Sequence, residues 1–149
     1  MADRAENCRV FPAALAGGLN SQRRLASEPG GGYCPGMLDL RRIGLFTRDL
    51  DDDYRQEKLA RLFRRANIEL VLDAAEASDG ELDLVIALGG DGTVLRALAA
   101  HPSAPVLAIN FGTVGFLTQS DREHMDEVLV RLLADDYAIE ERLTLSVAH

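Results

Sequence analysis

The residues with the clearest chemical potential form one short segment, Gly89-Gly90-Asp91-Gly92-Thr93. An apolar run rich in branched residues, 82–88, precedes it and predicts a strand buried on both faces. The run that follows, 94–100, consists mainly of Ala and Leu and predicts a helix that begins near Thr93. A strand-to-helix junction of this kind lies at the carboxyl end of a parallel sheet, where open α/β folds bind ligands.

The residue types in this segment are typical of anion binding. Gly89, Gly90 and Gly92 let the backbone approach a bulky anion, and the helix start near Thr93 offers free N–H groups to a phosphate. Asp91 is the one acid among these donors, so we expect it to accept a proton from a substrate hydroxyl, to orient that hydroxyl or to help hold a metal. The alternative is a plain Asp-Gly turn in which Asp91 caps the helix. The segment matches neither the Walker pattern nor the dinucleotide fingerprint.

A second glycine-bearing loop follows the next predicted strand. Residues 106–110 form an apolar run, and residues 111–118 then read Phe-Gly-Thr-Val-Gly-Phe-Leu-Thr. Two neighbouring strands that both end in such loops can build two walls of one crevice. Asn110 either orients this loop through its amide or simply ends the strand.

The elements around these loops alternate between strand and helix from residue 41 onward. Strands are predicted over 42–48 and 68–72 in addition to 82–88 and 106–110, with a final extended segment over 137–147. A helix is predicted after the acidic break at 49–53, with Arg61, Arg64 and Arg65 on its solvated face, and another begins at Asp121. This order predicts an α/β fold, a three-layer sandwich with a mostly parallel sheet.

Composition limits the class of protein. The chain has 149 residues, enough for one domain with a core, and a formal net charge of −8 that lies entirely after residue 40. An acidic body without a basic stripe argues against nucleic acid and against an anionic membrane as partners. Cys8 and Cys34 have no ligand-like neighbours, so neither a disulfide framework nor a zinc site is indicated. We therefore expect a reducing, cytoplasmic location.

Residues 1–40 contain glycine clusters and three of the five prolines without sustained periodicity. Asp3 and Glu6 make the start a poor secretory signal, and an Arg- and Ala-containing transit peptide is an alternative. We expect a disordered leader over 1–40 and a domain over 41–149, with Met37 as a natural start.

The two loops together resemble the NAD kinases. The resemblance rests on Gly89-Gly90-Asp91-Gly92-Thr93, on the segment 105–118, and on Glu141-Arg142-Leu143-Thr144-Leu145, and it covers about residues 41–149. The first motif is shared with diacylglycerol and sphingosine kinases and, with Ser for Thr, with phosphofructokinases. The second motif is much more specific, because lipid kinases of that superfamily carry a Gly-Thr-Gly-Asn type of loop there.

The resemblance implies phosphoryl transfer from ATP, or in some members polyphosphate, to the 2′-hydroxyl of the adenosine ribose of NAD, giving NADP. It makes Asp91 the proton acceptor and Gly92 its partner in nucleotide contact. It places Arg96 against the dinucleotide and Phe116 on the adenine of NAD, where the alternative for Phe116 is core packing. It also implies Mg²⁺ with ATP.

The resemblance further implies a second, β-rich domain with an Asn-Glu motif, through which full-length members assemble as homo-oligomers. Residues 41–149 contain no Asn-Glu pair. We therefore expect that this chain corresponds to the amino-terminal half of an NAD kinase and has little or no kinase activity alone. The alternatives are a non-catalytic nucleotide-binding fragment and a lipid kinase that shares only the first loop.

Overall fold

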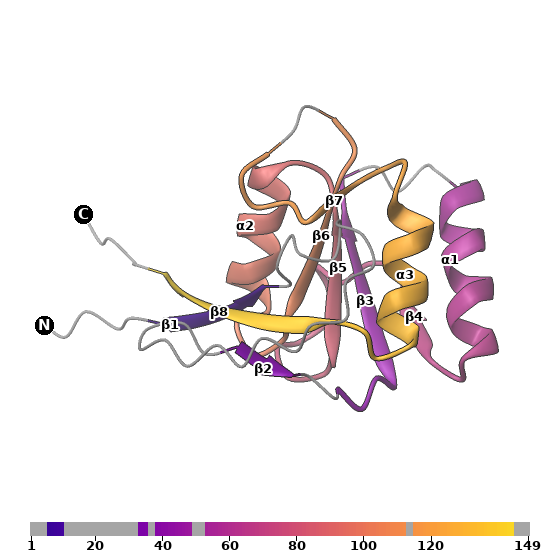
Figure 1. Cartoon of the computed structure of the whole chain (residues 1–149), viewed down its shortest axis with the longest axis horizontal. Coiled ribbons are helices and arrows are strands. Elements are labelled where there is room, and N and C mark those ends of the chain that lie inside the picture. Colours follow the sequence, from indigo (N-terminus) through magenta and orange to yellow (C-terminus); the bar gives the residue numbers. More distant parts are fainter. Residues whose placement is uncertain (1–5, 11–32, 36–37, 49–52, 113–114, 145–149) are drawn as a thin grey trace, which may run out of the picture.

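A mostly parallel sheet with helices on both faces forms the centre of the computed structural model (Figure 1). The structure describes residues 6–10, 33–35, 38–48, 53–112 and 115–144. The strands are β1 (Glu6–Val10), β2 (Tyr33–Pro35), β3 (Arg42–Thr47), β4 (Glu69–Val71), β5 (Leu84–Leu88), β6 (Val106–Asn110), β7 (Ser120–Asp121) and β8 (Ala138–Thr144). The helices are α1 (Asp53–Arg65), α2 (Asp91–Ala100) and α3 (Met125–Leu133).

The strand order in the sheet is β2-β8-β1-β6-β5-β3-β4, and β7 also pairs with β6. The pairs among β1, β6, β5, β3, β4 and β7 are parallel, whereas β8 runs antiparallel to both β1 and β2. Strand β1 pairs with the beginning of β6 at Val106, and β7 pairs with its end at Ile109 and Asn110. The central strands β5 and β6 therefore end side by side, and the two glycine loops leave the same edge of the sheet.

Side-chain size differs between the two faces of β5 and β6. On one face, Leu84, Ile86, Leu107 and Ile109 pack in a cluster that includes residues of α1 and α3. On the other face, the smaller residues Val85, Ala87, Val106 and Ala108 pack against Val94, Ala97 and Leu98 of α2. Because successive side chains of a strand point to opposite faces, one continuous apolar run supplies both cores. Figure 1 shows α2 on one side of the sheet and α1 and α3 on the other.

The predicted three-layer α/β fold is confirmed, and the strand prediction over 106–110 matches β6 in both bounds. Strands β3, β4 and β5 lie within the predicted runs, and α1 begins at the predicted acidic break. Arg61, Arg64 and Arg65 are exposed, as expected for a solvated helix face. The prediction that a helix begins at Asp121 is wrong. Residues 120–121 instead extend the sheet as β7, and α3 begins four residues later at Met125.

Short parts of the segment before residue 41 are among the residues that the structure describes. Strands β1 and β2 lie in this segment and pair with β8. Leu38 and Leu40 pack against the apolar cluster on the α1 and α3 side of the sheet. The Leu38 N–H donates to the Tyr137 hydroxyl at 2.9 Å. Strands β1 and β2 are thus held in the sheet by pairing with β8, although their sequences show no periodicity that would predict a strand. Met37, the suggested start, lies outside the described residues.

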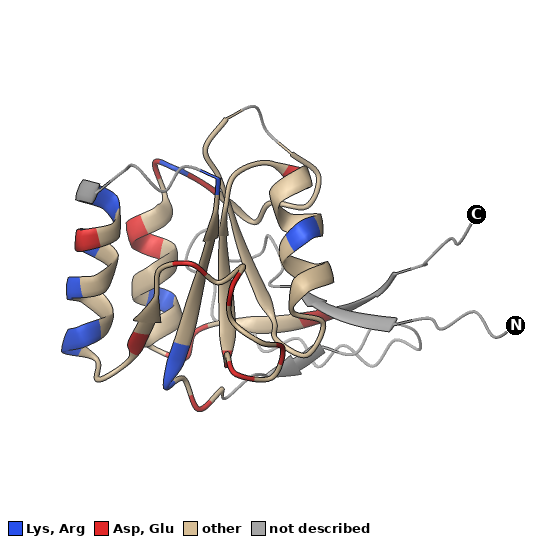
Figure 2. Ribbon diagram, turned by 180° about the vertical axis from the view of Figure 1, so that it is seen from behind, with Lys and Arg blue, Asp and Glu red and all other residues tan. Residues whose placement is uncertain are grey.

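Charged side chains are distributed unevenly over the elements (Figure 2). Helix α1 carries five basic side chains, Arg55, Lys58, Arg61, Arg64 and Arg65. The connection between β4 and β5 carries five acids, Asp73, Glu76, Asp79, Glu81 and Asp83. None of the helices in the described ranges is long and apolar enough to cross a membrane.

Gly44 in β3 faces Leu82 and Ala74, which belong to the apolar cluster on the α2 side of the sheet. A Cβ at this position would overlap Leu82 Cδ1 and would lie 2.7 Å from the Ala74 Cβ. We expect Gly44→Ala to lower the free energy of unfolding by about 1–3 kcal/mol, the usual cost of overpacking. Urea denaturation measures the change. Gly112→Ala is the control, because a Cβ there meets nothing within 4 Å, and an equal loss of stability in both variants would contradict the prediction.

Candidate functional site

The first glycine loop joins β5 to α2 in a conformation that requires glycine at its first position. Gly89 has a φ of +154°, and a Cβ there would lie 2.5 Å from the Thr93 Oγ1 atom. The Gly89 N–H donates to the Ile109 carbonyl at 3.0 Å, which ties the loop to β6. At Gly90 and Gly92 a Cβ would meet nothing within 4 Å, so internal packing does not demand glycine there. The backbone at these two positions is open to a close approach.

Asp91 is the first residue of α2, but its side chain does not cap the helix. Gly90 occupies the N-cap position without a side-chain cap bond, so the capping alternative for Asp91 is wrong. The Asp91 carboxylate instead accepts the Phe116 N–H on Oδ2 at 3.0 Å and the Leu117 N–H on Oδ1 at 2.9 Å. A carboxylate offers about four acceptor positions, so capacity is left for a ligand hydroxyl. The two motifs that carry the resemblance thus meet at one side chain.

Gly115 explains why the second loop can approach Asp91 so closely. A Cβ at position 115 would overlap the Asp91 Oδ1 atom and would lie 2.9 Å from Cγ. Any side chain at this position would push the loop away from the carboxylate. The second glycine of the loop is therefore a steric requirement of the contact with Asp91.

Two amides hold the second loop against β6. The buried Gln119 side chain accepts the Ala108 N–H at 2.7 Å and donates to the Leu117 carbonyl at 2.7 Å. The buried Asn110 side chain accepts the Gly112 N–H at 2.9 Å, which confirms that Asn110 orients the loop. Sequence reasoning missed Gln119, whose only signal was a polar amide just after the motif. Its burial, which decides its role, comes from the fold.

Phe116 and Arg96, the other two predicted contacts of the dinucleotide, both lie at the surface. The Phe116 ring is 97% exposed, so the alternative of core packing is wrong. The exposed Arg96 lies one turn into α2, and its Nε donates to the Gly92 carbonyl at 3.1 Å. This bond turns the guanidinium back toward the glycine loop, as its position in the helix predicts. Both side chains are therefore accessible to a ligand.

A cavity of about 460 Å³, here named the arginine cavity, borders the first glycine loop. It is lined by Thr47, Arg48, Arg55, Leu88, Gly89, Gly90, Thr93, Phe111, Gly112 and Arg122. Sequence reasoning found the glycines and Thr93 but missed the three arginines. Arg48 follows β3, Arg55 lies in α1 and Arg122 follows β7, so only the fold brings them together. The cavity combines cationic side chains with the amino-terminal end of α2, which suits an anion.

Neighbouring groups hold these arginines in place or leave them accessible. The Arg55 guanidinium lies over the Phe111 ring, 4.0 Å from its centroid, in a cation–π contact. Asp121, next to Arg122 in the chain, hydrogen-bonds His124 Nδ1 at 2.7 Å. This hydrogen bond and the attraction of opposite charges lower the pKa of Asp121 and raise the pKa of His124. Asp121 is therefore engaged by His124 rather than by Arg122.

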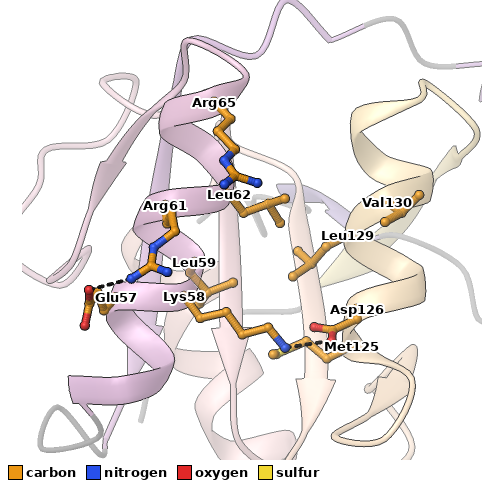
Figure 3. A pocket seen from close by; sticks show the side chains of 10 residues that line it. All are labelled: Glu57, Lys58, Leu59, Arg61, Leu62, Arg65, Met125, Asp126, Leu129 and Val130. Carbon is orange, nitrogen blue, oxygen red and sulfur yellow. Dashed lines mark hydrogen bonds and ion pairs between the residues drawn. The ribbon is translucent and has the colours of Figure 1, made fainter.

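A second hollow, the α1–α3 groove, lies between these two helices and has a volume of about 380 Å³ (Figure 3). Its floor is apolar, with Leu62 and Leu129, and Val130 is 61% exposed at its edge. Two ion pairs cross or flank it, Lys58 with Asp126 at 2.6 Å and Arg61 with Glu57 at 2.8 Å. No residue of the two motifs lines this groove.

A metal ion would find few protein ligands here. Among the described residues, no group of three His, Cys, Asp or Glu side chains converges in a way that could hold a metal. The carboxylate of Asp91 is the acid of the first motif.

Gly115→Ala tests the contact between the two loops. Since the new Cβ would overlap the Asp91 carboxylate, we expect both loop hydrogen bonds to break and the free energy of unfolding to fall by about 1–3 kcal/mol. Amide NMR shifts of Phe116 and Leu117 would report the lost bonds. Gly92→Ala is the control, because its Cβ has open space. Unchanged Phe116 and Leu117 shifts in Gly115→Ala would contradict the geometry.

The pair of Asp121 and His124 makes a prediction about pH. We expect the imidazole of His124 to titrate above about 6.5, the ordinary pKa of histidine. Asp121→Asn should lower the pKa of His124, because it weakens the hydrogen bond to the imidazole and removes the attraction of the negative charge. Glu127→Gln should lower it less, because Glu127 acts only through space. The titration of the His124 ring protons by NMR measures the shift, and a larger effect of Glu127→Gln would refute the assignment.

Comparison with known proteins identifies the family of this chain. Residues 45–137 match the ATP-NAD kinase N-terminal domain family. The NAD kinase of Mycobacterium tuberculosis is 50% identical over 82 residues, which cover 54% of this chain and 26% of that protein. The NAD kinase of Corynebacterium glutamicum is 40% identical over 107 residues, which cover 70% of this chain and 35% of that protein. The matched region thus spans about a quarter to a third of the length of these relatives.

A solved structure shows the same fold at low sequence identity. The crystal structure of yeast NADH kinase complexed with NADH aligns with a TM-score of 0.50 and 17% identity. The alignment covers 87% of this chain and 48% of the yeast chain. The family match at residues 45–137 includes both glycine loops and the residues that connect them. The chain therefore belongs to the NAD kinase family and carries its amino-terminal domain.

Proposed function

We propose that this chain supplies the catalytic loop of an NAD kinase, which transfers a phosphoryl group from ATP or polyphosphate to the 2′-hydroxyl of the adenosine ribose of NAD. The product is NADP. Membership of the family and the names of the relatives support this activity. The enzyme would act in the cytoplasm, and the full-length protein would form a homo-oligomer.

One observation carries the proposal, namely that the Asp91 carboxylate binds the backbone of the second loop. The first motif alone is compatible with lipid, sugar or dinucleotide kinases. The second motif favours a dinucleotide kinase among these classes. The hydrogen bonds from Phe116 and Leu117 hold this motif against Asp91, the proposed reacting centre. An acid held between two glycine loops can accept a hydrogen bond from a ribose hydroxyl on its remaining lone pairs.

Asp91 would act mainly by orienting the 2′-hydroxyl. Phosphoryl transfer proceeds through a loose transition state, in which little charge has developed on the attacking oxygen. Positioning that oxygen in line with the donor is then worth more than early removal of its proton. The two backbone N–H groups fix the plane of the carboxylate before the substrate arrives.

Gly92, Arg96 and Phe116 would bind the dinucleotide around Asp91. Gly92 allows the backbone to approach the ribose, because nothing lies within 4 Å of the position of its missing side chain. The Arg96 guanidinium already points toward the loop and would pair with the pyrophosphate of NAD. The exposed Phe116 ring would stack on the adenine, which would cover an aromatic face now in contact with water.

Mg²⁺ would accompany ATP and neutralise charge on its phosphates. The protein offers Asp91 as the acid at the first motif, so the phosphates and water would supply the other ligands.

An assay of NADP formation with NAD, ATP and Mg²⁺ tests the proposal in a protein that joins this chain to the carboxy-terminal part of a related NAD kinase, because we expect little or no activity from the chain alone. We expect Asp91→Asn to reduce the rate by about two to four orders of magnitude, the usual contribution of a positioned acid or base. Asp135→Asn, at an exposed position after α3, is the matched control. Because this chain aligns with only part of its relatives, NAD binding is measured beside turnover by calorimetry. Phe116→Ala and Arg96→Gln should each weaken NAD binding about tenfold.

Two results would contradict the assignment. One is phosphorylation of diacylglycerol in place of NAD. The other is NAD binding that is equally strong in the wild type, in Phe116→Ala and in Arg96→Gln.

Gly115→Ala distinguishes the role of the second loop from the role of the acid, since it displaces the loop while the Asp91 carboxylate remains. A rate as low as that of Asp91→Asn would show that the contact between loops is required.

A further inference from the structure

Strands β1 and β7 pair with the two ends of β6 on the side opposite β5. Strand β1 pairs at Val106, and β7 pairs at Ile109 and Asn110. Between these ends the backbone of Ala108 pairs with Gln119. The Gln119 N–H donates to the Ala108 carbonyl at 2.9 Å, and the Ala108 N–H donates to the Gln119 Oε1 atom at 2.7 Å. Gln119 thus serves as the strand partner of Ala108, with one backbone group and one side-chain group.

The same side chain also holds the second loop. The Gln119 Nε2 atom donates to the Leu117 carbonyl at 2.7 Å, and the Leu117 N–H donates to the Asp91 Oδ1 atom at 2.9 Å. One residue earlier, the Phe116 N–H donates to the other carboxylate oxygen at 3.0 Å. A continuous series of hydrogen bonds therefore runs from Ala108 in β6, through the Gln119 amide and the second loop, to Asp91.

These contacts require an amide at position 119. The side chain accepts a hydrogen bond from a backbone N–H on its oxygen and donates one to a backbone carbonyl from its nitrogen. An amide offers both groups at once, whereas a carboxylate only accepts and an apolar side chain does neither. Because Gln119 is buried, a backbone group that lost this partner would find little water in its place.

We propose that Gln119 is a positioning residue for the acceptor side of the reaction. Through Leu117 it fixes the second loop on the Asp91 carboxylate, and it thereby sets the affinity for the dinucleotide. This inference rests on the proposed function, which assigns the binding of NAD to Asp91 and Phe116. Gln119 itself is buried, so it acts through the loop and not by contact with the substrate.

The Phe116 ring depends on this loop for its position. The ring is almost fully exposed, so packing against other side chains contributes little to holding it. Its backbone N–H is bonded to Asp91, and the carbonyl of the next residue is bonded to Gln119. A backbone that is held before the dinucleotide arrives reduces the ordering that binding requires, which raises affinity. We therefore expect loss of the amide to weaken the binding of NAD and to leave the binding of ATP unchanged.

Steady-state kinetics test this role in the protein that joins this chain to the carboxy-terminal part of a related NAD kinase. We expect Gln119→Leu to raise the KM for NAD about tenfold, the equivalent of one hydrogen bond to a charged group, and to leave the KM for ATP unchanged. Gly44→Ala is the matched control, because it overpacks β3 outside both glycine loops. A general loss of stability lowers the amount of active enzyme, so Gly44→Ala should move neither KM.

Gln119→Glu tests the need for a donor within one folded protein. The new carboxyl can still accept the Ala108 N–H, but only its protonated form can also donate to the Leu117 carbonyl. Burial disfavours the charged form, so the protonated form persists above the ordinary pH range of a Glu side chain. We expect the KM for NAD, divided by the wild-type value at the same pH, to rise as the pH rises. The same ratio for ATP should stay constant.

Amide NMR shifts of the 149-residue chain without NAD test the hydrogen bonds directly. We expect the N–H shifts of Leu117 and Phe116 to change in Gln119→Leu and to stay in place in Gly44→Ala. Thermal unfolding of each variant shows whether the fold is retained.

Three results would overturn the proposal: unchanged Leu117 and Phe116 shifts in Gln119→Leu, an equal rise of both KM values, or a KM ratio for NAD in Gln119→Glu that does not depend on pH. The shifts are recorded without substrate, so they do not depend on the proposed function. Altered shifts in a protein whose joined form makes no NADP would reject the kinase and keep the positioning role. NADP formation by Gln119→Leu with the wild-type KM for NAD would do the reverse.

Discussion

The contact between the Asp91 carboxylate and the backbone of the second loop is the constraint on which the site depends. It joins residues that are 25 and 26 positions apart, at 3.0 and 2.9 Å. Three local features make it possible. The left-handed Gly89 turns the chain out of β5, Gly115 leaves room for the carboxylate, and Gln119 pins the loop to β6. Both hydrogen bonds to Asp91 would be lost if the second loop moved away by about the length of a hydrogen bond.

The sheet explains why the two loops are neighbours. Strands β5 and β6 are parallel and adjacent in register from Val85 and Val106 to Leu88 and Ile109, so both chains leave the sheet at the same edge. The small residues on one face let α2 pack closely, and the large residues on the other face fill the space under α1 and α3. Only Gly89 and Gly90 lie between β5 and α2, so the start of α2, and with it Asp91, stays next to the end of β5.

Basic side chains are concentrated near the glycine loop, which the net charge of the whole protein does not reveal. The protein is acidic, yet α1 is rich in basic residues, and Arg55 joins Arg48 and Arg122 around the glycine loop. Asp91 and the exposed Phe116 ring are not among the residues that line this cavity, so the acid and the three arginines are separate features around one loop. A phosphotransferase needs this kind of division, because its acceptor hydroxyl and its anionic donor approach the same point from different directions.

The sequence by itself determined the α/β alternation, the buried character of 82–88 and 106–110, and the two glycine loops with Asp91 between them. These features are local, since periodicity and residue type report them directly. Tertiary structure decided what Asp91 binds, that Phe116 is exposed, and that Gln119 is buried. It also decided that β1 and β2 join the sheet, and that three arginines from separate elements line one cavity. These outcomes depend on strand pairing between distant segments, which leaves no periodic signal in the chain.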